Sequence, residues 1–91
     1  MKIVINVCHG GFGLSDKALE MYRAEVNDEH IDDYEIERND PVLVKLIEQL
    51  GVMANTRWSE LKVVEIPDGI EWIIQDYDGL EWVAEAHQTW R

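Results

Sequence analysis

The sequence predicts an α+β fold in which two helices pack on one face of a four- or five-stranded mixed sheet, with a C-terminal β-hairpin. Three observations predict this architecture. Ile3–Cys8 is an apolar, β-branched run that stops at glycines. Residues 16–26 and 41–50 carry apolar side chains at helical spacing. Asp78-Gly79 is a two-residue turn signal between two segments of strand composition.

The chain has 91 residues and is expected to fold as a single domain, 1–91. Apolar residues make up 46% of it, which favours folding over disorder. A domain of this size buries only about 60–65% of the surface that its unfolded chain exposes. Part of its core is therefore open to completion by a partner or by another copy of the chain, which makes a homo-oligomer one expectation.

The first half of the chain predicts a strand, a helix and a short edge strand. Ile3–Cys8 is expected in the middle of the sheet, covered on both faces, because it is almost wholly apolar. Ser15 is the expected N-cap of a helix over 16–26 that ends at Asn27-Asp28. Tyr34–Glu37 is expected as the edge strand. The buried stripe of the helix would contain Ala18, Leu19, Tyr22 and Val26.

The second helix has signals at both ends. Asp40 is its expected N-cap and Pro41 its first residue, where no N–H bond is lost. Gly51 is the expected left-handed C-terminal cap, which would let Val52 fold back on Ile47. The buried stripe would contain Leu43, Leu46, Ile47 and Leu50.

The C-terminal part predicts three strands. Leu61–Ile66 ends at a Pro67-Asp68-Gly69 turn, and a hairpin joins Ile70–Tyr77 to Leu80–His87. In this register Tyr77 faces Leu80, Gln75 faces Trp82 and Ile73 faces Ala84, which makes one face mostly apolar. The other face carries Trp72, Ile74 and Val83 between Asp76, Glu81 and Glu85, and these three carboxylates are expected to face solvent. A helix over Leu80–His87 is the competing interpretation.

The charge of the chain restricts its partners. Nineteen acidic residues against eight Lys and Arg give a net charge of −11, which repels nucleic acid and anionic membranes and attracts basic proteins. No run of apolar residues is long enough to span a bilayer, and Met1–Asn6 is too short for a secretory signal. Cys8 is the only cysteine, so no intrachain disulfide can form and a cytoplasmic location is expected.

Two acidic stretches, over 28–40 and 63–90, are the candidate protein-binding surfaces. The first has a single basic residue, Arg38, and the second has neither Lys nor Arg. A solvated face is the plainest interpretation of such stretches, but regularly spaced carboxylates beside tryptophans also suit a basic groove on another protein. The first stretch lacks the ligand spacing of a calcium-binding EF-hand loop. The expected protein-binding residues are Asp32, Asp33, Trp72, Asp76, Asp78, Glu81 and Glu85.

A glycine-rich loop between the first strand and the first helix is the alternative site. Backbone N–H groups in such a loop can hold an anionic nucleotide, although the loop lacks the Gly-Lys-Ser/Thr of a phosphate-binding motif. A tight turn is the plainer interpretation. The ligand-binding residues would be Gly10, Gly11, Phe12, Gly13 and Ser15. The other histidines, His30 and His87, are far in sequence from Cys8 and His9, and a free cysteine at the end of a buried strand usually acts as a small apolar residue, so no catalytic residue, metal or cofactor is expected.

The string MKIVINVCHGGFGLS, from Met1 to Ser15, resembles the opening of a family of small proteins encoded by phages and prophages. The resemblance continues over nearly the whole chain, although Gln88 stands where that family carries Arg. The later segments that carry it are Arg38–Pro41, Lys62–Asp68, Tyr77–Gly79 and His87–Trp90.

The family has no established activity. The resemblance therefore implies a biological setting but identifies no catalytic residues. It implies an accessory protein in the bacterial cytoplasm. The expected function is that of a non-enzymatic inhibitor that binds and neutralises a basic protein of host defence, by occupying its nucleic-acid-binding groove. The alternatives are a nucleotide-sequestering protein and a subunit of a phage assembly.

Overall fold

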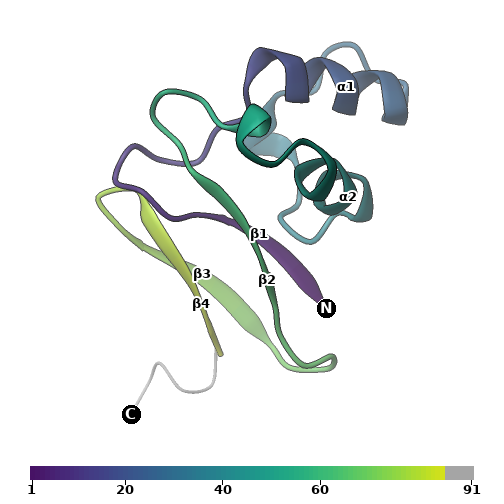
Figure 1. The fold of residues 1–91 in the computed structure, drawn as a ribbon. Coiled ribbons are helices and arrows are strands. Elements are labelled where there is room, and N and C mark those ends of the chain that lie inside the picture. The colour runs from purple at the N-terminus through teal and green to yellow at the C-terminus, as the bar shows by residue number, and fades with distance from the viewer. Residues whose placement is uncertain (86–91) are drawn as a thin grey trace.

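The fold is α+β, and the computed structural model describes residues 1–85. Its regular elements are β1 (Lys2–Asn6), α1 (Asp16–Val26), α2 (Pro41–Leu50), β2 (Leu61–Glu65), β3 (Trp72–Tyr77) and β4 (Leu80–Glu85), with 3₁₀ turns η1 (Asp33–Glu35) and η2 (Gly51–Ala54). Both helices lie on one side of β1 and β2, and the β3–β4 hairpin lies on the other side of this pair in Figure 1.

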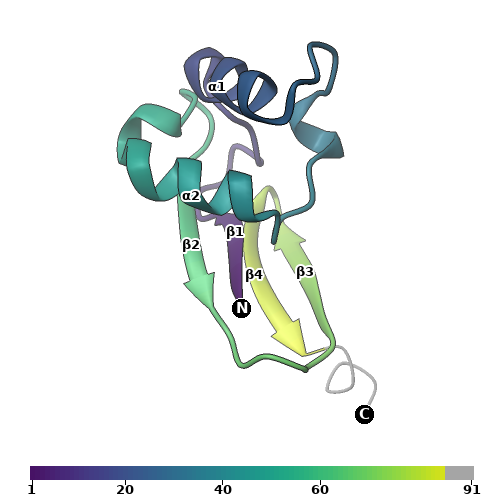
Figure 2. The ribbon, with the colours of Figure 1, turned by 90° about the vertical axis from the view of Figure 1, so that its right-hand side faces the viewer.

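The strands form two separate antiparallel pairs, β1 with β2 and β3 with β4, rather than one sheet of four or five strands. Figure 2 shows β1 between β2 and β4, but only β2 forms a backbone ladder with it. The expected burial of the first strand is confirmed, because Ile3, Val4, Ile5 and Asn6 are all buried. Its expected place inside a single sheet is wrong, because side chains occupy the edge of β1 that faces β4.

Both predicted helices begin and end at the predicted residues. The Ser15 hydroxyl accepts a hydrogen bond from the Ala18 N–H, and Asn27 closes α1 in the left-handed conformation. The Asp40 carboxylate accepts hydrogen bonds from the Val42 and Leu43 N–H groups at the start of α2. The main core lies between these helices and β1, and its buried members are Val4, Leu14, Ala18, Tyr22, Ile36, Leu43, Val44, Leu46, Ile47 and Ala54.

Two local predictions are wrong. Residues 34–37 form no strand, because Asp32 and Glu35 make a capping box that turns the chain into η1. Val52 does not fold back on Ile47 and is 81% exposed. Gly51 has the expected positive φ of 57°, but its ψ of −129° lies outside the left-handed helical region and the chain continues into η2.

The hairpin and its register are confirmed within the described residues. Tyr77 pairs with Leu80, Gln75 with Trp82 and Ile73 with Ala84. Asp78 and Gly79 have φ angles of 56° and 91°, as a type I′ turn requires. The competing helix is therefore wrong up to Glu85, and Ala86 and His87 lie outside the described residues. None of the helices within residues 1–85 has the length and apolarity to cross a bilayer.

Candidate protein-binding surface

A bidentate ion pair attaches the hairpin to the rest of the molecule. Arg38 Nη1 and Nη2 donate to Glu81 Oε1 and Oε2 over 2.6 and 2.9 Å. Only 9% of Glu81 is exposed, so the expectation that this carboxylate faces solvent is wrong. The paired geometry offsets the cost of removing both charges from water.

The same ion pair occupies the edge of β1. The Asn6 N–H donates to Glu81 Oε1 at 2.8 Å, and the Val4 N–H donates to the Arg38 carbonyl at the same distance. Arg38 Nη1 also reaches the Val4 carbonyl at 3.3 Å. Arg38 and Glu81 thus supply the donors and acceptors that a neighbouring strand would otherwise supply, which explains why β4 lies beside β1 without pairing with it.

The buried Asn6 side chain joins three segments where β1 ends. Its amide nitrogen donates to the carbonyls of Cys8 and Gly79, both at 2.7 Å, and its oxygen accepts from the Glu60 N–H at 2.8 Å. A single side chain therefore fixes the glycine loop, the hairpin turn and the start of β2. Every strong donor and acceptor of the amide has a partner, so its role is structural.

The glycine loop is packed against neighbouring backbone. A Cβ at Gly10 would lie 1.7 Å from the Trp58 carbonyl oxygen, and a Cβ at Gly79 would lie 2.5 Å from the Gly11 nitrogen. Gly79 is therefore required both for its positive φ and for this close approach. The Phe12 ring lies 3.6 Å beneath the Arg38 guanidinium, which gives it a partner inside the protein.

Two hydrogen-bond donors at the alternative nucleotide site already bond acceptors within the protein. The Leu14 N–H donates to Asp33 Oδ2 at 3.1 Å, so a carboxylate already lies at the end of the loop. Ser15 Oγ caps α1 and donates to the Met53 carbonyl. Gly11 has a φ of 96° with open space around it, and Gly13 is half-buried. The loop thus brings together Gly10, Gly11, Phe12, Gly13 and Ser15 where it packs against neighbouring segments of the chain.

The first acidic stretch is largely used inside the molecule. Asp32 pairs with Arg23 at 3.2 Å and takes part in the capping box of η1. Asp33 binds the loop, as described, and Asp40 caps α2. Asp32 and Asp33, two of the expected protein-binding residues, are therefore half-buried and already have partners.

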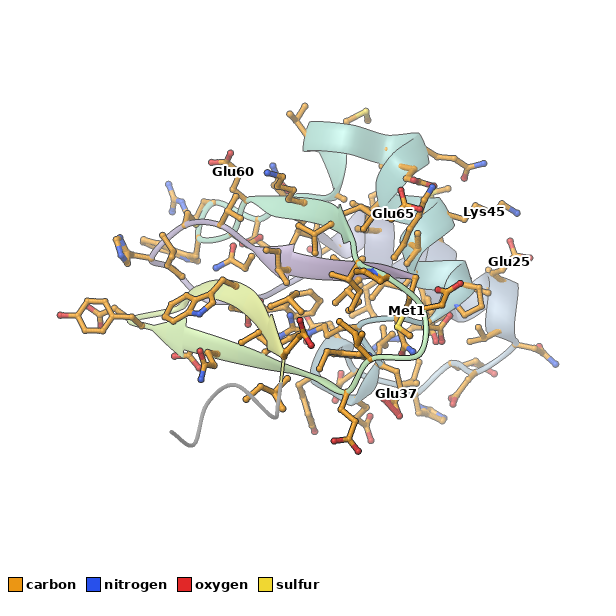
Figure 3. The ribbon with its side chains drawn as sticks, turned by 90° about the horizontal axis from the view of Figure 1, so that it is seen from below. Met1, Glu25, Glu37, Lys45, Glu60 and Glu65 are labelled. Atoms are coloured by element: carbon orange, nitrogen blue, oxygen red, sulfur yellow. The ribbon has the colours of Figure 1, made fainter. Side chains whose placement is uncertain are left out.

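The second acidic stretch leaves carboxylates free along the hairpin. Glu71, Asp76 and Asp78 are exposed, and none of them has a partner among residues 1–85. Trp72 and Glu85 are half-buried. Figure 3 shows other carboxylates, those of Glu25, Glu37 and Glu60, pointing outward on different sides of the molecule. Free carboxylates also occur on α1, at Asp16, Glu20 and Glu25, so the hairpin differs from the rest of the surface by its neighbouring exposed aromatic side chains rather than by charge alone.

The hairpin also exposes its apolar face, which the sequence did not lead us to expect. The side chains of Ile73, Tyr77 and Trp82 are 37%, 71% and 42% exposed, and the register places them on one face. The Trp82 indole N–H donates to the Gln75 side chain at 3.0 Å, which holds the ring across the strands. The opposite face, with Glu81 buried on it, is the one that packs inward.

Other parts of the described chain offer less to a ligand. Within residues 1–85 no three His, Cys, Asp or Glu side chains converge to hold a metal ion. The half-buried Cys8 thiol donates to the Trp58 carbonyl at 3.2 Å. A hollow of about 320 Å³ lies between the first residues of β1 and α2, but the Lys2 and Glu48 side chains at its border pair with each other at 2.7 Å.

Sequence reasoning missed Asn6 and Arg38 as the residues that position the hairpin. One signal was present, because Asn6 is a polar side chain inside an otherwise apolar strand, and such a residue needs buried partners. Comparisons of the chain with protein-family models, with curated proteins and with solved structures each find no match. The geometry of the hairpin is therefore the basis on which a function is argued.

Proposed function

We propose that this is a non-enzymatic binding protein whose hairpin docks on a basic surface of another protein. One observation carries the proposal. The hairpin exposes Tyr77 and Trp82 beside the free carboxylates of Glu71, Asp76 and Asp78. Exposed aromatic side chains supply contact area that stabilises a complex, while carboxylates steer and orient a basic partner.

The charge distribution supports a basic partner. Residues 63–90 contain no Lys or Arg, so no cation of this segment neutralises its carboxylates. At a net charge of −11 the whole chain attracts a cationic surface at long range. Nucleic acid and anionic lipid are repelled by the same field. A groove that normally binds nucleic acid is the kind of protein surface that matches this pattern.

The resemblance to phage and prophage proteins suggests the setting of this proposal. In that setting the chain acts in the cytoplasm of a host cell, where it occupies the basic groove of a defence protein and neutralises it. The nucleotide-binding alternative receives no support from the loop, because the Asp33 carboxylate already accepts the Leu14 N–H there.

Affinity capture with matched charge variants tests the proposal. The test variant is Glu71→Lys/Asp76→Lys, and the control variant is Glu25→Lys/Glu60→Lys, which makes the same change in charge at exposed sites elsewhere. We expect wild-type and control baits to retain the same basic protein from a bacterial lysate, and the hairpin variant to lose it. Capture should weaken as salt rises, because salt screens the attraction.

Equal retention by all three baits would contradict the proposal, and so would loss by the control variant alone. Circular dichroism of each bait shows whether it is folded, so that loss of the fold is not mistaken for loss of the surface.

A further inference from the structure

The outer edge of β3 is the feature from which a mode of binding follows. We propose that the basic partner adds an extended, Lys- or Arg-rich segment to this edge as a further β-strand. This inference rests on the proposed function and names the part of the partner that the hairpin recognises.

The register shows which backbone groups point outward. The residues that flank a two-residue turn form a hydrogen-bonded pair, so Tyr77, Gln75 and Ile73 bond across to β4. The backbone N–H and C=O groups of Trp72, Ile74 and Asp76 therefore point away from β4. No residue among 1–85 donates to or accepts from these three groups.

Within residues 1–85 the edge lacks several of the features that usually block such pairing. Natural edge strands are protected by Lys, Pro, bulges or covering segments. β3 is a regular strand of six residues, WIIQDY, with neither Lys nor Pro. In Figure 2 it lies on the outer side of the hairpin, with β4 between it and β1. Its backbone is thus presented as a template for another strand.

Side chains of the same chain fill the edge of β1 that faces β4. At β1 the Arg38 and Glu81 side chains bond the outward-facing groups of Val4 and Asn6. At β3 no described side chain bonds the equivalent groups. The fold therefore satisfies one strand edge internally and leaves the other for a partner.

Charge decides which strand fits. Asp76 lies on the edge strand, Glu71 and Asp78 flank it at its two ends, and all three are exposed, so cations carried by an incoming strand would meet a carboxylate at either end of β3. A second copy of this chain would instead bring the same carboxylates together, and each copy carries a net charge of −11. The observations thus favour a basic segment of a different protein over self-pairing.

Nuclear magnetic resonance with synthetic peptides tests the inference. The probe is an octapeptide that alternates lysine with valine, and the ¹⁵N-labelled full chain is titrated with it. We expect saturable shift changes centred on the Trp72, Ile74 and Asp76 amides, and slower hydrogen exchange of these three. A peptide of the same sequence, N-methylated along one edge, keeps its charge but loses the donors, and we expect it to bind at least about tenfold more weakly.

Each other outcome overturns the inference in a different way. Equal binding of the methylated peptide would show that charge alone attracts the partner, which leaves the proposed function intact. Absence of binding by the lysine peptide, or shift changes centred elsewhere, would show that a partner strand does not add to β3. Protection of the three amides in the free protein, together with a dimer in sedimentation, would show that a second copy occupies the edge.

Discussion

The Glu81 carboxylate lies where the carbonyl groups of a pairing strand would otherwise lie. It accepts hydrogen bonds from the Asn6 N–H and from both terminal nitrogens of Arg38. The strand register was predicted correctly, but the alternation of side chains alone did not show which hairpin face packs inward. The partner of Glu81 is 43 residues away in the sequence, and a contact at that distance leaves no local pattern.

Neutralising Glu81 should destabilise the fold. Glu81→Gln keeps the size of the side chain but leaves Arg38, whose side chain is 21% exposed, without its counter-ion. Removing one partner of a buried pair costs about 3–5 kcal/mol, and the partial exposure of Arg38 favours the lower end. Urea unfolding measures the loss, with Glu60→Gln on the surface as the control.

The double variant Arg38→Met/Glu81→Leu separates the effect of losing the ion pair from the effect of leaving one charge without a partner. It should be less destabilised than the sum of its two single variants, because no uncompensated charge remains. If Glu81→Gln unfolds at the same urea concentration as Glu60→Gln, the anchoring role of the pair is wrong.

At the scale of elements, α1 and α2 are joined through one carboxylate. Asp40 Oδ1 caps α2, while Asp40 Oδ2 accepts a hydrogen bond from the Tyr22 hydroxyl at 2.7 Å. The sequence predicted both helices because caps, the N-terminal proline and apolar stripes are local signals. It could not predict that the cap of one helix binds the side chain of the other, because that depends on how the helices pack.

The stability of the protein at alkaline pH should report the hydrogen bond between Tyr22 and Asp40. Burial, followed by the Asp40 carboxylate, raises the pKa of Tyr22 to about 12, against about 10 in an unfolded chain. A raised pKa means that the contribution of Tyr22 is complete below pH 10 and is lost as the pH rises through 12. Urea unfolding between these values should therefore show a falling free energy of unfolding.

The variant Tyr22→Phe should remove this part of the alkaline decline, whereas Tyr77→Phe, which alters an exposed tyrosine, should leave it unchanged. A decline of the same steepness in Tyr22→Phe would assign it to other groups, such as the lysines.

At the scale of the whole molecule, the charge of the chain opposes its own folding. Nineteen acidic residues are held closer together in the folded chain than in the unfolded one. The composition alone predicted this excess, but only the fold separates carboxylates with internal partners, such as Asp32 and Asp33, from the free ones on the hairpin. The hairpin was found from sequence by its turn, while the splitting of the expected sheet depended on Arg38 and Glu81.

Salt should therefore stabilise the protein. Raising sodium chloride from about 0.01 to about 0.15 M shortens the screening length from roughly 30 to 8 Å. A relief of repulsion of about 1 kcal/mol would raise the melting temperature by roughly 4–8 °C in a domain of this size. Calorimetry measures the shift, and Glu71→Lys/Asp76→Lys should show a smaller one. A melting temperature that does not depend on salt would contradict this account.

The distance in sequence between Arg38 and Glu81 also has a consequence for biosynthesis. A ribosome adds about 5–20 residues per second, so the 43 residues that separate the pair take roughly two to nine seconds to make. β1, both helices and β2 are all synthesised before Glu81, and until it follows, the Asn6 amide and the Arg38 guanidinium have only water in its place. The nascent chain thus carries an open strand edge that closes only when the hairpin emerges.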